Sequence, residues 1–466
     1  MKQLFSYSDR IHFVGIGGIG MSSLAYLLAQ RGYQVSGCDS NLDQKTCANL
    51  RTLNIPLYQQ QQSCCFDQEH PTYIVYSSAM QQDSYDLMWA REHRIPLLHR
   101  SDILAALFTM HQGIAISGSH GKTTTSALIA HCLIQGGIDA SAVIGGMVHS
   151  LNGNAHHGTN NYLVAEADES DRTFEKYHTH FTLITNIERE HVDTYTSDEI
   201  MYKAYATYAN NGPMDGCVFL NNDDRGCQTL VPSIIRPIRW YSIDNPQADI
   251  QIINTRWEHT RWLFDVVEKN TIIKNFILNL FGKHMLSNAA GAISVARACG
   301  LSWEALRATL ASFVTVDKRF SFCGKTITGA TIIDDYAHNP TKIKAFFNAL
   351  RLTSLIHKNM IIFQPHRYTR TEAFFDQYVD VFCANHDIHS LIITDIYAAF
   401  EQPIPGISSV DLVNAINTNH HNLACYVPYG QVKSYLQERL SFLAKDDALI
   451  FLGAGSVNNL IKDFVV

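Results

Sequence analysis

Apolar and polar positions alternate along this chain in a pattern that predicts strands and helices in turn. The first segment begins with the apolar run "IHFV" (11–14), followed by the glycine-rich stretch 15–20 and a helical pattern over 21–30. A second predicted strand, 33–39, closes on Asp39, about twenty residues after the glycines. This order predicts the βαβ opening of a dinucleotide-binding type of fold, whose glycines let backbone approach a diphosphate at a helix N-terminus.

Two further strand patterns and one helix complete this segment. Apolar runs at 73–79 and 95–98 are followed by "SDILAALF" (101–108), whose Ser-Asp start is typical of a helix N-terminus. We therefore place the first domain boundary after residue 108.

The second segment repeats the alternation and adds an insert. Apolar runs at 114–117, 162–165 and 181–185 predict strands of a second sheet, and a helix is predicted to begin near Ser287. The region 237–280, with "WYSI" and "WLFDVV", has the pattern of an antiparallel β insert.

From Val316 onward the chain returns to β-rich runs separated by helical stretches. The runs lie at 331–335, 359–363, 391–394 and 448–452. Four such runs with helices between them predict a third, mainly parallel sheet.

Length and composition agree with three globular domains. The chain has 466 residues, and domains average about 150. The hydrophobic fraction of 46% and charged fraction of 17% are those of an ordinary globular protein. We predict α/β domains over 1–108, 109–315 and 316–466.

The charge balance argues against a nucleic-acid partner. A net charge of −7 supplies no basic field, so any anionic ligand must be held by local groups. No apolar run approaches the roughly 18–20 residues of a membrane span, and the start "MKQLFSYSDRIHFVG" lacks the apolar segment of a signal peptide. Together these two features predict a cytoplasmic protein. The eleven cysteines, with Cys64 and Cys65 adjacent and no CxxC, are expected to be reduced thiols, mostly buried.

The candidate chemistry centres on "GSHGKTTT" (118–125), which lies between an apolar run and a helical pattern. Only two residues separate Gly118 from Gly121, fewer than in a GxxxxGKT loop. A loop in this position supplies backbone N–H donors, a point charge from Lys122 and a hydroxyl from Thr123 for Mg²⁺. The pattern predicts a triphosphate-binding loop; the alternative is a glycine turn with a solvated lysine.

Polar residues follow the next two predicted strands. In "AEADESD" (165–171), Glu166 comes directly off a strand and would face the nucleotide, where one carboxylate with Thr123 and phosphate oxygens suits Mg²⁺. In "TNIEREHVD" (185–193), His191 is a candidate second metal ligand. The alternatives are a solvated acidic loop and an ordinary histidine.

Two polar clusters end successive strands of the third segment, "DDYAHNP" (334–340) and "FQPHRYTRT" (363–371). Asp334 or Asp335 could accept hydrogen bonds from ribose hydroxyls, and two arginines with a histidine make a local anion clamp. Clusters at neighbouring strand ends indicate one ligand between domains.

In their joint order and spacing, these motifs resemble those of the Mur ligases over nearly the whole chain, and most closely the branch that joins L-alanine to UDP-N-acetylmuramate. The resemblance implies a Rossmann-like first domain that holds the UDP-sugar, a central P-loop ATPase-like domain with a β insert that holds ATP and Mg²⁺, and a Rossmann-like third domain that receives the amino acid. It rests on "HFVGIGGIGM" (12–21), "GSHGKTTT", "AEADESD", "TNIE" (185–188) with His191 and "DTY" (193–195), "DDY" (334–336) with His338, and "FQPHRYTRT".

The resemblance also assigns residues. It places Lys122 on the β/γ-phosphates, Thr123 and Glu166 on one Mg²⁺ and His191 on a second. Where the family has Gly-x-His-Asn beside adenine, this chain has Gly282-Lys283-His284-Met285, with Asn288 one turn further along. The implied catalytic residues are Lys122, His366, Arg367 and Arg370. The implied ATP-binding residues are Gly118, Ser119, His120, Gly121, Lys122, Thr123, Thr124, His284, Asn288, Arg319, Asp335, Tyr336 and His338. The implied sugar-nucleotide residues are Gly15, Gly17, Gly18, Gly20, Asp39, Ser77, Ser78, His99 and Arg100.

The implied function is an ATP-dependent ligation of L-alanine to UDP-N-acetylmuramate through an acyl phosphate, in peptidoglycan precursor synthesis. The enzyme would act as a monomer or homodimer on small molecules. The alternatives are a ligase that recycles a preformed tripeptide, an NAD-dependent oxidoreductase that uses the N-terminal glycines, and a non-catalytic nucleotide-binding scaffold. Removal of Lys122 is expected to abolish turnover with little loss of folding.

Overall fold

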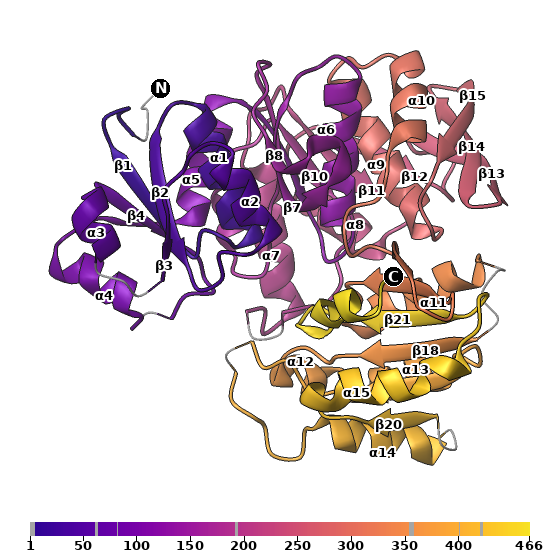
Figure 1. Cartoon of the computed structure of the whole chain (residues 1–466). Coiled ribbons are helices and arrows are strands. Elements are labelled where there is room, and N and C mark those ends of the chain that lie inside the picture. Colours follow the sequence, from indigo (N-terminus) through magenta and orange to yellow (C-terminus); the bar gives the residue numbers. More distant parts are fainter. Residues whose placement is uncertain are drawn as a thin grey trace. The chain divides into compact units, whose positions relative to one another are not determined.

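Three sheets organise the computed structural model of the chain (Figure 1), which describes residues 5–60, 64–81, 83–191, 194–353, 358–399, 401–419 and 423–466. Their contacts divide it into two compact units. One comprises Met1–Asn279 with Leu286–Val316, and the other Leu280–Met285 with Asp317–Val466. The predicted three-domain α/β fold is confirmed, while the domain boundaries after residues 108 and 315 stay predictions.

The first sheet has the order β3-β2-β1-β4-β5 and is parallel throughout. The apolar run 11–14 forms most of its central strand and is fully buried, as expected for a strand covered on both faces. Its strands are β1 (Arg10–Val14), β2 (Gln34–Asp39), β3 (Leu57–Gln59), β4 (Tyr73–Tyr76) and β5 (Leu97–His99), and its helices are α1 (Ile19–Gln30), α2 (Lys45–Arg51), α3 (Cys64–Glu69), α4 (Tyr85–Glu92) and α5 (Arg100–Met110).

The second sheet has ten strands in the order β15-β14-β13-β12-β11-β10-β6-β9-β7-β8. Strands β13, β14 and β15 pair antiparallel, so the predicted insert is confirmed there. The run "WYSI" was assigned to that insert wrongly, because β12 pairs parallel with both β11 and β13. The strands are β6 (Gln112–Ser117), β7 (Ser141–Val148), β8 (Gly153–His156), β9 (Tyr162–Glu166), β10 (Phe181–Ile184), β11 (Cys217–Asn221), β12 (Ile238–Ser242), β13 (Ile250–Glu258), β14 (Arg261–Glu268) and β15 (Thr271–Leu278).

Five helices accompany the second sheet. They are α6 (Lys122–Gln135), α7 (Asp198–Asn210), α8 (Arg225–Leu230), α9 (His284–Ala298) and α10 (Trp303–Ser312). Helix α9 begins at His284, earlier than the predicted start near Ser287. Short 3₁₀ turns cover His149–Leu151, Thr173–Lys176, Val231–Ser233, Leu440–Phe442 and Val457–Asp463.

The third sheet has the order β16-β17-β21-β18-β19-β20 and is parallel except at one edge, where β16 runs antiparallel to β17. The four predicted strands are present. The outer strands β16 and β20 were not predicted, because they lack a continuous buried apolar run. The strands are β16 (Ser321–Lys325), β17 (Thr331–Asp335), β18 (Asn359–Phe363), β19 (Ser390–Ile393), β20 (Ala424–Tyr426) and β21 (Ala448–Leu452), with helices α11 (Pro340–Arg351), α12 (Tyr368–Ala373), α13 (Phe375–Cys383), α14 (Ser409–Asn419) and α15 (Tyr429–Arg439).

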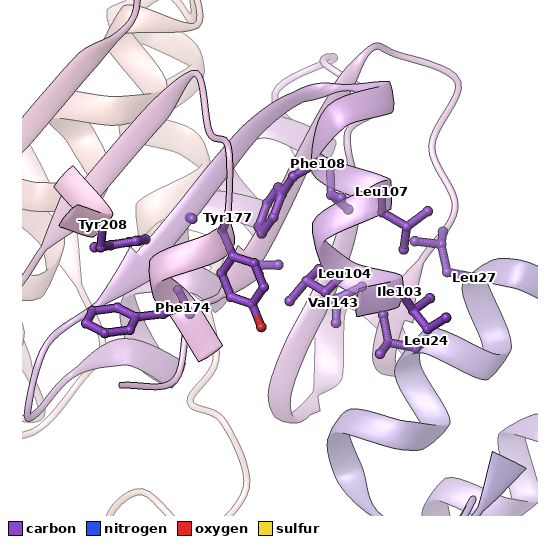
Figure 2. Packing of buried hydrophobic residues seen from close by; sticks show 14 of the residues in the cluster. Leu24, Leu27, Ile103, Leu104, Leu107, Phe108, Val143, Phe174, Tyr177 and Tyr208 are labelled. Carbon is purple, nitrogen blue, oxygen red and sulfur yellow. The ribbon is translucent and has the colours of Figure 1, made fainter. Parts of the chain in front are cut away.

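One apolar core connects the first and second sheets. Leu24 and Leu27 of α1 belong to the same buried cluster as Leu104 of α5, Val143 of β7 and Tyr177 (Figure 2). Because close-packed side chains resist relative displacement, this core fixes the first domain against the central one. On the third sheet, two separate clusters lie under its helices.

The sequence predicted that the chain has no membrane span and that its cysteines are reduced thiols. Within the described ranges, no helix is long and apolar enough to cross a membrane. Six cysteines are free, buried thiols: Cys38, Cys47, Cys65, Cys132, Cys217 and Cys227. The side chain of Cys64 and residue Asp193 of the "DTY" motif lie outside the described part of the structure.

Candidate active site

The predicted phosphate loop joins the end of β6 to the start of α6, and two of its positions require glycine. Gly118 has φ +129°, and a methyl group there would overlap the hydroxyl of Thr185. Gly121 is the N-cap of α6 with φ +83°, and a methyl group there would lie 2.5 Å from Oδ1 of Asn288. Asn288, which lies on α9 and was predicted to contact ATP, is therefore packed against the phosphate loop.

The loop is fixed by the segment that follows β10. The main-chain N–H of His120 donates to Oδ1 of Asn186 (2.9 Å), and the Thr185 hydroxyl donates to the His120 carbonyl (2.6 Å). Ser119 Oγ accepts from the main-chain N–H of Glu188 (2.9 Å). These bonds hold the loop open at the helix N-terminus, where N–H groups favour an anion. Asn186 had no assigned role in the sequence; its only signal was the quoted "TNIE" motif.

Replacing Gly118 with alanine is expected to lower both stability and ATP affinity, because the methyl group meets Thr185 in addition to the unfavourable φ. The matched control is Gly137→Ala. Gly137 also has a positive φ (+94°) but open space around it, so only the conformational cost of about 1–2 kcal/mol applies. Chemical denaturation and ATP titration of both variants separate the two effects. Equal losses of stability with unchanged ATP binding would contradict the steric role of Thr185.

Lys122 begins α6 and points back over the loop. Its Nζ donates to Oε1 of Glu169 (2.8 Å) and to the carbonyl of Gly118 (2.6 Å). Burial disfavours the charged amine, but the carboxylates of Glu169 and Asp168 outweigh it and raise the pKa of Lys122 above its usual value. The lysine is therefore fully charged at neutral pH. Glu169, whose side chain is only 3% exposed, is a site residue that the sequence analysis did not single out.

Glu166 and Thr123 form the oxygen cluster predicted for a metal. The Thr123 hydroxyl donates to one Glu166 carboxylate oxygen (3.2 Å), and Ser126 Oγ and the main-chain N–H of Gly145 donate to the other (3.3 and 2.8 Å). Thr123 and Thr124 are buried in the first turn of α6. The strand end therefore aims Glu166 at the phosphate loop, as its position after β9 predicted.

His191, the candidate second metal ligand, lies beside Glu169. Its Nε2 is 3.6 Å from Oε1 of Glu169. Glu169, Glu190 and His191 each offer a ligand atom within 4.8 Å of the others, and they are the group among the described residues that could hold a metal through three such side chains. The order of strands in the sequence does not show which acid of "AEADESD" His191 faces, so the contact with Glu169 was not predicted.

The first-domain glycines form a turn held by Asp39. One carboxylate oxygen of Asp39 accepts from the Gly17 N–H (2.9 Å), and the other accepts from the Asn41 N–H (2.9 Å) and the Gln44 side chain (3.2 Å). Gly15 has φ +75°, which suits glycine, and Gly18 donates its N–H to the Gly15 carbonyl (3.1 Å). In this structure Asp39 supports the loop. Its contact with uridine stays a prediction.

The predicted sugar-nucleotide residues of β4, β5 and α5 meet acids of the central domain. Ser78 Oγ donates to Asp171 (2.5 Å) and lies 3.0 Å from Nε2 of His99. Arg100 approaches Asp168 (3.6 Å), and its guanidinium would be 3.2 Å from a methyl group at Gly20. Ser77 is half-buried beside them, and its carbonyl accepts from the Met80 N–H (3.0 Å). The structure thus brings these residues to the edge where "AEADESD" ends.

In the other unit, Asp335 and Tyr336 lie at the end of β17. Asp335 accepts the main-chain N–H groups of Phe320 (2.8 Å) and Ala337 (2.7 Å), and desolvation raises its pKa. The guanidinium of Arg319 lies 5.0 Å from the Tyr336 ring centre. His284 belongs to this unit by its contacts, whereas Asn288 belongs to the first.

The histidines and arginines of the predicted anion clamp also lie together. The ring centres of His338 and His366 are 5.8 Å apart. Arg370 Nη1 is 3.1 Å from Nδ1 of His366, and since arginine only donates, that nitrogen accepts. Desolvation and the charges of Arg370 and Arg367 lower the pKa of His366 to about 4, so the ring is neutral. Arg367 Nε forms a short ion pair with Glu401, a residue that the sequence analysis missed.

Fold and loop together define an α/β protein with a phosphate-loop central domain, and comparison with known proteins gives its family. Three family models match: the Mur ligase family catalytic domain over residues 10–112, the Mur ligase middle domain over 116–296 and the Mur ligase glutamate ligase domain over 318–455. The chain therefore belongs to the Mur ligase family and is an ATP-dependent ligase. The resemblance inferred from its motifs is confirmed.

Curated relatives cover nearly the whole chain. A UDP-N-acetylmuramate–L-alanine ligase from Desulfotalea psychrophila is 36% identical over 457 residues, 97% of each chain. One from Hydrogenobaculum sp. is 35% identical over 458 residues, 98% of each chain.

Solved structures show the same fold. UDP-N-acetylmuramate-alanine ligase MurC from Thermotoga maritima has a TM-score of 0.80 at 23% identity, and a murein peptide ligase from Psychrobacter arcticus has 0.74 at 19%. Each of these comparisons covers 98% of both chains.

Proposed function

We propose that this chain joins L-alanine to the lactyl carboxylate of UDP-N-acetylmuramate, with cleavage of ATP to ADP and phosphate. The observation that carries the proposal is end-to-end similarity, at 35–36% identity, to ligases named for that reaction. The phosphate loop with its half-buried, charged Lys122 supports it, since the reaction needs a triphosphate site in the central domain.

The proposed chemistry has two steps. A carboxylate oxygen of the sugar attacks the γ-phosphorus, the bond to the β-phosphate oxygen breaks, and ADP leaves with that electron pair. The alanine amine then attacks the acyl carbon, phosphate departs with one oxygen of the original carboxylate, and the amine loses a proton. Both steps gather negative charge on oxygen, so they require fixed positive groups.

Residues of this chain would supply those groups. Lys122 would exchange Glu169 for the β/γ-phosphates, and the N–H groups of residues 121–123 at the start of α6 would face the same anion. Arg367 and Arg370 would neutralise the phosphoryl group and the substrate carboxylate, and neutral His366, with Nδ1 accepting, would present its Nε2–H as a donor. Arg319, Asp335, Tyr336, His338 and His284 are assigned to the nucleotide.

Mg²⁺ fits the residues present. Thr123 and Glu166 offer hard oxygen atoms 3.2 Å apart beside the phosphate loop, which is the donor type and low protein-ligand number that this ion prefers. When bound, Mg²⁺ would neutralise phosphate charge and orient the phosphoryl group. Glu169, Glu190 and His191 are proposed to hold the second ion.

The sugar nucleotide is assigned to the first domain. Its diphosphate would face Gly15, Gly17, Gly18 and Gly20, whose lack of side chains permits close approach at the start of α1. Arg100, between Gly20 and Asp168, and the Ser78–His99 pair are placed to contact the sugar portion. Because these substrates are soluble nucleotides and amino acids, we assign the enzyme to the cytoplasm. We propose that it acts as a monomer or homodimer.

A product assay tests the proposal. The protein is incubated with ATP, Mg²⁺, UDP-N-acetylmuramate and single amino acids, and the adduct is identified by mass. We expect an adduct with L-alanine, together with stoichiometric ADP. An adduct formed only with a tripeptide would favour the recycling ligase, and the absence of any adduct would contradict the proposal.

A further inference from the structure

The anion clamp of the third domain is built on a second segment, residues 394–399 with Glu401, which follows β19. The main-chain N–H of Arg367 donates to the carbonyl of Tyr397 (2.8 Å), and the N–H of Tyr397 donates to the carbonyl of Pro365 (2.8 Å). These bonds form an isolated parallel bridge between His366 and Tyr397. The clamp turn 365–367, which follows β18, is therefore paired with residues that follow the next strand, β19.

This pairing supports a strained backbone position. Arg367 has φ +70° and ψ 135°, a conformation that a non-glycine residue adopts only when its surroundings impose it. The His366 ring also stacks on the Tyr397 ring, with centres 5.4 Å apart and planes at 19°. Strain at one clamp arginine, beside the neutral His366 and Arg370, indicates a turn shaped for ligand contact.

Glu401 ends the supporting segment and fixes the Arg367 side chain. One carboxylate oxygen pairs with Arg367 Nε and accepts the Thr369 hydroxyl (2.8 Å), and the other accepts the Thr369 N–H (3.0 Å). Burial opposes the charge, but these hydrogen bonds lower the pKa of Glu401, so it is ionised at neutral pH. Its side chain is 15% exposed. A carboxylate held by Thr369 on two atoms is a fixed point for the guanidinium.

We propose that Glu401 is a positioning residue for the ligation: it orients Arg367 toward the charge that develops on the transferred phosphoryl group. This inference rests on the proposed function. Arginine has four rotatable side-chain bonds, so a guanidinium on a strained surface turn would otherwise sample many orientations. The ion pair through Nε selects one of them, and this pre-orientation lowers the barrier without adding a contact to substrate.

The test is the kinetics of Glu401→Gln with a matched control. We expect kcat to fall about tenfold to a hundredfold, the range for losing a charge-assisted hydrogen bond, while KM for ATP is unchanged. The control is Asp387→Asn, which removes another carboxylate from an arginine Nε (Arg351, 2.6 Å) in the same unit. That pair is half-exposed, so its loss should leave kcat within about twofold.

A double mutant shows whether Glu401 acts through Arg367. In an Arg367→Ala background, Glu401→Gln should cause no further loss of kcat, because the group it orients is gone. Glu401→Asp, which keeps the charge, should recover part of the activity. A full additional loss in the double mutant, a Glu401→Gln enzyme as active as Asp387→Asn, or an increase of kcat would overturn the inference.

A second readout separates this inference from the proposed function. A wild-type enzyme that forms no alanine adduct contradicts the proposed function, and the role of Glu401 is then decided by NMR of the Arg367 Nε–H group. We expect that proton to be protected from exchange in the wild type and exchange-broadened in Glu401→Gln. The same resonance in both proteins would overturn the inference.

Discussion

Replacing Lys122 with alanine is expected to lower kcat by about a thousandfold or more, because no other group of the loop places a charge on the transferring phosphate. The structure adds an effect on stability that the sequence did not predict. Lys122 Nζ pairs with Glu169, whose side chain is 3% exposed, so the variant leaves a buried carboxylate without its cation. Breaking such a pair costs about 3–5 kcal/mol. The sequence alone predicted little loss of folding for this variant, whereas the structure predicts a clear loss in the free energy of unfolding.

The variant Lys122→Ala/Glu169→Gln separates the two effects. Neutralising Glu169 removes the unpaired charge, so the double mutant should regain most of the lost free energy of unfolding and remain inactive. Urea unfolding and ADP release measure the two quantities. Turnover restored in the double mutant would mean that Lys122 serves only to offset Glu169, and near-wild-type turnover in Lys122→Ala would exclude its assigned role.

Replacing Glu166 with glutamine has the second largest expected effect. The amide keeps an oxygen for the donors that hold Glu166, including Gly145 N–H (2.8 Å), so the fold should tolerate the change. The charge that suits a divalent cation is lost. We expect the Mg²⁺ concentration for half-maximal rate to rise about tenfold or more and kcat to fall about a hundredfold.

Glu175 provides the control for Glu166, because it lies in the 3₁₀ turn Thr173–Lys176 and pairs with Arg172 (2.6 Å). Glu175→Gln should leave the magnesium titration unchanged. If Glu166→Gln titrates with Mg²⁺ like the wild type, Glu166 is a structural acid that positions Gly145 and Ser126, and the proposed metal site is wrong.

The local sequence pattern was sufficient to predict those parts of the fold in which a buried strand leads directly into a glycine-rich turn. The runs 11–14, 359–363 and 448–452 are fully buried strands, and 331–335 is buried at its three central residues. A strand covered on both faces is mostly apolar, so its sequence alone indicates it. The phosphate loop was found for the same reason, since its glycines, lysine and threonine are consecutive. Such features depend on neighbours in sequence.

Partners distant in sequence could not be predicted. The sequence does not distinguish the roles of the four acids of "AEADESD". In the structure Glu166 accepts from Thr123, whereas Glu169 accepts from Lys122. Asn186 fixes His120, and Glu401 fixes Arg367, through contacts that only tertiary pairing creates. The run "WYSI" was placed in the antiparallel insert because alternation alone does not give strand direction.

Transfer of a labelled oxygen atom tests the central claim most directly. UDP-N-acetylmuramate carrying oxygen-18 in its lactyl carboxylate is incubated with ATP, Mg²⁺, L-alanine and the enzyme, and the released phosphate is analysed by mass. Activation through an acyl phosphate predicts one oxygen-18 atom in each phosphate and an alanine adduct in equal amount. Unlabelled phosphate, or label found in AMP, would contradict the account.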